Sequence, residues 1–196
     1  MRKSINFLIG LLSISLFLNL LLALSYHDAT QDKRQLVNEM CATITLSGIS
    51  ASSRLDEALE ASDRRLILMA GIEIEQLSSI LESSISKELG VKNTYGPGSL
   101  ASLAELIIWG GSTNGVSPLG SPNDTTPLSL DEIEMIKSIS SALKKLALSF
   151  YDESVTENTY MYENRSHSNI TAVNRALLTL QTDTESIFEN NRKRIY

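Results

Sequence analysis

The chain has 196 residues, of which 42% are hydrophobic and 20% are charged, and its net charge is −6. Residues 27–196 contain all 23 acidic residues and 15 of the 17 basic residues, all except Arg2 and Lys3, so the net charge of this part is −8. Such an acidic surface repels phosphate backbones, and we expect no nucleic-acid partner. A single cysteine excludes an internal disulfide, so packing must hold the domain together.

The first predicted element is a single transmembrane signal-anchor helix over residues 5–26. This run of 22 residues carries no charge and would span about 33 Å as a helix, close to the roughly 30 Å of a bilayer core. Arg2 and Lys3 precede it, which predicts residues 1–4 in the cytoplasm and residues 27–196 as an extracytoplasmic domain of a cell-membrane protein. The alternative is a secreted chain, cleaved near Ser25 after the small-x-small pattern of residues 23–25.

Within this span, Ser15, Asn19 and Ala23 are spaced i, i+4, i+8 and therefore share one helix face. Small and amide side chains on one face allow two helices to approach closely and to form a hydrogen bond. We therefore predict a candidate membrane-helix association face, through which the chain would form a homo-oligomer. The alternative is that a long Leu-rich helix simply tolerates one Asn.

Helical character continues beyond the span. Residues 28–47 contain no Gly or Pro, so the same helix is predicted to run on. Cys41 lies with Met40 and Ile44 on its apolar face, which predicts a buried structural thiol rather than a reactive one. Residues 43–50 combine β-branched side chains with Gly48, which are poor in a helix interior, and this composition predicts a bend or turn.

A long helix is predicted over residues 52–89. Glu60 and Arg64 are spaced as an i, i+4 ion pair, and Gly90 follows in a position typical of helix ends. The apolar residues recur at intervals of three and four, which predicts a stripe facing a partner helix. The members of this stripe are Ile67, Ala70, Ile74, Leu77 and Leu81.

The next segment, "LASLAELIIWGG", predicts a short helix over residues 100–109. Ser102 and Glu105 have capping-box spacing, and Glu105 is the only charge of the segment. A helix that is apolar all round is buried; the alternative is docking on a partner or on the membrane surface. The candidate docking or pocket residues are Leu103, Leu106, Ile107 and Trp109.

Residues 110–129 are Gly, Ser, Pro, Asn and Thr almost throughout, which predicts a mobile loop. Ser129 and Glu132 form a second capping-box pattern that opens a helix over residues 130–150. A polar connector leads to a last helix. The predicted inner stripes of these two helices are Ile133, Ile136, Ser140, Leu143, Ala147 and Phe150, and Ile170, Val173, Leu177, Leu180, Thr184 and Ile187.

The predicted fold class is therefore all-α. A single transmembrane helix precedes an extracytoplasmic bundle of about four main helices plus one short apolar helix. This layout resembles the extracytoplasmic helical modules of bacterial membrane proteins, including sensor ectodomains.

No pattern typical of catalysis or ligation occurs in the chain. The two histidines, His27 and His167, have no ligand at metal-binding spacing, and there is no HExxH, CxxC, GxSxG or phosphate-binding loop. We therefore predict no catalytic residue, no cofactor and no metal. The predicted function is a protein-interaction, accessory or scaffold module whose partners are the membrane and another membrane or envelope protein. The alternatives are a sensor-like bundle that binds a small apolar ligand and a hydrolase without a recognisable motif.

Overall fold

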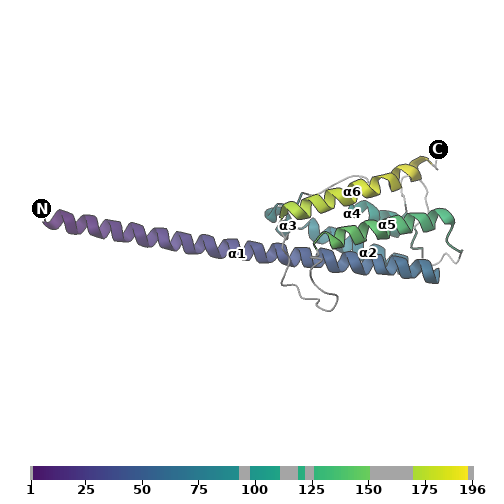
Figure 1. The fold of residues 1–196 in the computed structure, drawn as a ribbon, viewed down its shortest axis with the longest axis horizontal. Helices are drawn as coiled ribbons and strands as arrows, with labels where there is room; N and C mark the ends of the chain where they lie inside the picture. The colour runs from purple at the N-terminus through teal and green to yellow at the C-terminus, as the bar shows by residue number, and fades with distance from the viewer. Residues whose placement is uncertain (1, 93–97, 111–118, 122–125, 151–169, 194–196) are drawn as a thin grey trace. The chain divides into compact units, whose positions relative to one another are not determined.

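A computed structural model describes residues 2–92, 98–110, 119–121, 126–150 and 170–193, and the side chains of 2–14, 16, 20, 21, 23 and 186–193 lie outside that description. The described residues form helices and no strand, so the all-α prediction is confirmed. The helices are α1 (Arg2–Ala61), α2 (Arg64–Leu81), α3 (Ser84–Leu89), α4 (Leu100–Ile108), α5 (Leu130–Leu148) and α6 (Ile170–Lys193), as drawn in Figure 1.

The chain divides into two compact units, Met1–Val37 and Asn38–Tyr196. The first unit is the N-terminal part of α1, in which Phe17 and Leu22 are 61% and 67% exposed. Among the residues that the structure describes, no helix combines the length and the apolar character needed to cross a membrane. The membrane span predicted for residues 5–26 is therefore not supported by the structure.

In the second unit, α1 continues through residues 43–50, so the predicted bend is wrong. The hydroxyl of Thr45 donates a hydrogen bond to the Cys41 carbonyl one turn earlier, at 2.8 Å. Gly48 faces α5 so closely that a Cβ atom there would lie 3.1 Å from the Cβ of Ala147. Gly48 thus allows α5 to approach, and this packing outweighs the weak helix preference of the segment.

The predicted helix over residues 52–89 is interrupted twice. Ser62 has a positive φ of 54°, and Asp63 caps the N-terminus of α2 with its side chain. A second break follows α2, where Ser83 caps the N-terminus of the short helix α3. Gly90 then ends α3 in the left-handed conformation at φ 93°, as predicted. The Ser-Asp dipeptide at residues 62–63 was the local signal for the first break.

Serine side chains cap the N-termini of α4 and α5. Ser99 caps α4 by accepting a hydrogen bond from the backbone of Ser102, so the cap lies three residues before the Ser102–Glu105 pair that has capping-box spacing. The Ser129–Glu132 capping box of α5 is confirmed, with the Ser129 N–H donating to Glu132 Oε2 at 2.8 Å. Each cap satisfies backbone donors that the first helical turn leaves unpaired.

The predicted apolar stripes form most of the core of the second unit. Cys41 is fully buried, and all five stripe residues of α2 are buried. On α5 and α6 the buried members of the predicted stripes are Ile136, Ser140, Leu143, Ala147, Phe150, Val173, Leu177, Leu180 and Thr184. Ile133 and Ile170 are half-buried, and the side chain of Ile187 lies outside the described residues. Among the described residues, the four long helices and the short apolar α4 match the predicted set, whereas α3 was not predicted.

Arg64 joins α2 to the segment before α5 and to α5 itself. Its guanidinium donates to the Leu119 carbonyl at 3.1 Å and to the Glu132 carboxylate at 2.9 and 3.3 Å. The predicted pairing of Arg64 with Glu60 is wrong, because the helix break at residues 62–63 separates them. Leu119 is buried, so part of the predicted 110–129 loop packs on the bundle. Residues 111–118 and 122–125 of that loop lie outside the described residues.

Candidate functional site

The two helices α2 and α4 pack unusually closely. A Cβ atom at Gly71 would lie 2.6 Å from Ile107 Cγ2 and 2.9 Å from Ile108 Cγ1. Small residues allow two helix backbones to approach in this way, and larger side chains at the same crossing would separate them. The absence of a side chain at Gly71 therefore allows α4 to lie directly against α2. The residues that flank this crossing form a surface shared by both helices.

The four residues predicted as a docking or pocket segment divide into two groups. Leu103, Leu106 and Ile107 are 0%, 5% and 0% exposed and belong to the core. Trp109, the C-cap of α4, is instead 69% exposed. The sequence could not separate the buried residues from the exposed one, because the segment is apolar on every side of the helix. Which side is covered depends on where α4 crosses α2.

Backbone contacts hold Trp109 at the surface. Its N–H donates to the Glu105 carbonyl at 2.9 Å, which completes the last turn of α4. Gly110 has a φ of 71° and turns the chain out of the helix. The N–H of Gly120 returns to the Ile107 carbonyl at 3.0 Å, so the end of α4 is tied to the following segment. The indole is thus exposed on a fixed backbone.

Trp109 lines a hollow of about 390 Å³ between α2 and α4, which we call the Trp109 groove. Glu75 and Glu82 lie two helical turns apart, about 10 Å along α2, and Glu105 contributes a third carboxylate from α4. None of the described residues that line the groove is basic. It is lined by Glu75, Ser78, Ser79, Glu82, Ala101, Ala104, Glu105, Ile108 and Trp109.

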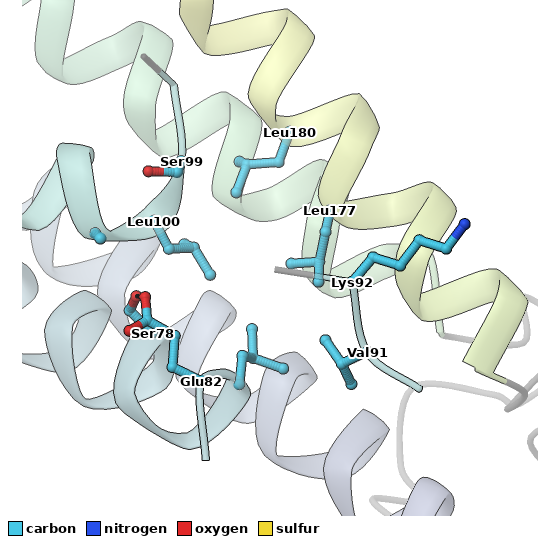
Figure 2. A pocket seen from close by; sticks show the side chains of 10 residues that line it. Ser78, Glu82, Val91, Lys92, Ser99, Leu100, Leu177 and Leu180 are labelled. Carbon is cyan, nitrogen blue, oxygen red and sulfur yellow. Dashed lines mark hydrogen bonds between the residues drawn. The ribbon is translucent and has the colours of Figure 1, made fainter. Parts of the chain in front are cut away.

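A second hollow lies beside the groove, between α2, α4 and α6, and shares Ser78, Glu82 and Ala101 with it. Figure 2 shows Leu177 and Leu180 pointing from α6 into this crevice, while the amino group of Lys92 points away from it. Its volume of about 20 Å³ holds roughly one water molecule. The crevice is therefore too small for the apolar ligand of the sensor-like alternative.

The other residues singled out from the sequence are described only in part. Ser15 and Asn19 of the predicted association face are exposed, and the side chain of Ala23 lies outside the described residues. Cys41 is buried and His27 is exposed, whereas His167 lies outside the described residues. No group of three His, Cys, Asp or Glu side chains that could hold a metal ion occurs within the part of the chain that is described.

Comparison of the chain with protein-family models, with curated proteins and with solved structures found no match. The function of this chain must therefore be inferred from its own geometry. Within that geometry, the Trp109 groove combines the features of a recognition surface, namely a concave shape, an exposed aromatic ring and charge of one sign.

Proposed function

We propose that this chain is a membrane-anchored, extracytoplasmic helical protein that acts as an interaction or accessory module without catalysis. Its helical bundle would dock another membrane or envelope protein at the Trp109 groove. The N-terminal part of α1 would hold the bundle at the membrane surface, with residues 1–4 in the cytoplasm.

The anchoring part of the proposal rests on residues 5–26, which carry no charge. Among the described side chains of this segment, Phe17, Leu18, Leu22 and Leu24 are all more than half exposed. An apolar helix needs to be covered by lipid or by other helices, because exposed apolar area costs free energy in water. Self-association through Ser15, Asn19 and Ala23 would cover part of it.

The observation that carries the docking proposal is Trp109, exposed by 69% at the edge of the groove. Tryptophan is enriched at the centre of protein interfaces, where it supplies a large contact area with few rotatable bonds. A solitary exposed Trp on a flat surface would mean little. Here the ring borders a hollow whose lining includes four small Ser and Ala side chains, which leave room for a partner side chain.

The test is site-specific photo-cross-linking in the cells that express the chain. A photoreactive amino acid replaces Trp109 in one variant and Leu148 in the control, since Leu148 is 58% exposed on α5 and does not line the groove. We expect a discrete protein adduct in the membrane fraction from position 109 and none from position 148. Equal labelling from both positions, or no adduct from position 109, would refute the docking function.

A further inference from the structure

We propose that the Trp109 groove recognises a basic segment of the partner protein, with a Lys or Arg side chain lying against Trp109 between the three carboxylates. This inference rests on the proposed docking function and adds the chemistry of the partner. The occupant to which we commit is a protein segment with several Lys or Arg residues, rather than a lipid or a second copy of this chain.

Charge complementarity is the first argument. Of the nine described residues that line the groove, three are glutamates and none is basic. Glu75 and Glu105 are exposed, and Glu82 accepts a hydrogen bond from Ser78 Oγ at 3.2 Å. Carboxylates that line a concave surface concentrate the negative potential, which attracts a cationic segment and speeds its association. The −8 charge of residues 27–196 acts in the same direction.

The exposed indole is the second argument. A cation that lies over the face of a tryptophan ring is attracted by the ring quadrupole, and the attraction is strongest for tryptophan among the aromatic side chains. Trp109 and Glu105 are four residues apart on α4, so they share one face of the helix. A Lys or Arg side chain could thus place its stem against Ile108 and the indole, and its charge near a carboxylate.

The groove dimensions fit a peptide better than a compact ligand. The hollow of about 390 Å³ is partly open to solvent, and Glu75 and Glu82 are seven residues apart, which corresponds to about 10 Å along the helix axis. In an extended peptide of the polyproline II type, which has three residues per turn and a rise of about 3.1 Å per residue, residues i and i+3 lie on the same side and roughly 9 Å apart. Two basic side chains at that spacing could therefore contact Glu75 and Glu82 at the same time.

The experiment uses the full chain in a mild non-ionic detergent and an eight-residue lysine peptide as the probe. Trp109 is the only tryptophan, so its fluorescence reports binding at the groove without a label. We expect saturable binding that weakens as salt rises, because the contacts are solvent-accessible charges. An eight-residue glutamate peptide should produce no change.

The variants test where the peptide binds. Changing Glu75, Glu82 and Glu105 together to Gln should weaken binding about tenfold or more, since each partly exposed charge pair contributes a factor of roughly two to five. The matched control is Glu134→Gln, which removes an exposed carboxylate on α5 outside the groove and should change affinity less than about twofold. Helical circular dichroism of each variant confirms that it is folded.

Four outcomes would overturn the inference. Equal weakening by Glu134→Gln and by the triple variant would mean general attraction to an acidic protein. A shift of Trp109 fluorescence with phosphatidylcholine vesicles but not with the lysine peptide would assign the groove to the membrane surface. A position-109 adduct that contains only two copies of this chain would assign it to self-association. A position-109 adduct with another protein, together with no peptide binding, would leave the docking function intact and refute only the basic partner.

Discussion

Arg64 is the side chain whose removal tests the architecture most directly. It is 5% exposed, and its guanidinium donates to the Leu119 carbonyl at 3.1 Å and to both oxygens of Glu132 at 2.9 and 3.3 Å. The variant Arg64→Met keeps an unbranched apolar stem but removes the charge and all donors. The change in stability therefore reports the hydrogen bonds and the ion pair rather than the loss of packing.

The expected loss of folding stability can be estimated from the hydrogen bonds that Leu119 and Glu132 would lose in Arg64→Met. Leu119 is buried, so leaving its carbonyl without this donor costs about 1–3 kcal/mol. Glu132 is 26% exposed and can recover some hydration, so its loss of a charged partner costs about 1.5–3 kcal/mol. The two contributions add up to an expected total loss of about 2.5–6 kcal/mol.

Urea denaturation followed by helical circular dichroism measures this loss. The matched control is Arg65→Met, one residue further along, where the side chain is exposed and the change should stay within about 0.5 kcal/mol. Amide hydrogen exchange of Gly120 provides a local readout, because its N–H is bonded to the Ile107 carbonyl. It should accelerate in Arg64→Met and stay unchanged in Arg65→Met. A loss below about 1 kcal/mol, or equal losses in the two variants, would refute the reasoning.

Three further predictions concern the packing and the charges of the bundle. Leu177→Ala should cost about 2–5 kcal/mol, because Leu177 is buried, whereas Leu178→Ala at a 58% exposed position should cost less than about 0.5 kcal/mol; urea denaturation compares them. Gly71→Ala should lower the melting temperature by overpacking the α2–α4 crossing, at a cost of about 1–3 kcal/mol; an increase would show that α4 does not press on α2. Burial would raise the pKa of Glu132, but hydrogen bonds from Arg64 and Ser129 outweigh it and hold the pKa below its ordinary value of 4.5. The stabilisation that ionised Glu132 contributes is present above pH 4.5 and is lost as the pH falls through the lowered pKa. The urea midpoint should therefore drop over this acidic pH range, and it should drop less in Glu132→Gln.

The sequence alone predicted the features that depend on local periodicity and local hydrogen bonds. The stripe of α2 and most of the stripes of α5 and α6 are buried as expected, because a repeat of three and four residues puts apolar side chains on one helix face whatever the partner. The Ser129–Glu132 capping box and the left-handed Gly90 also need only their own neighbours in the chain. Residues 62–63 carried a comparable cap signal, but the surrounding helical pattern concealed it.

Only the tertiary structure decided the features that depend on which helices meet. Gly48 lies inside a helix because α5 packs against it, although the low helix propensity of residues 43–50 predicts a bend. Arg64 pairs with Glu132, a residue 68 positions away, rather than with Glu60. Ile107 and Trp109 belong to the same short apolar segment, yet Ile107 is covered by α2 whereas Trp109 is exposed beside the groove. A local pattern determines which side chains share a helix face, whereas burial and pairing depend on surfaces supplied by distant parts of the chain.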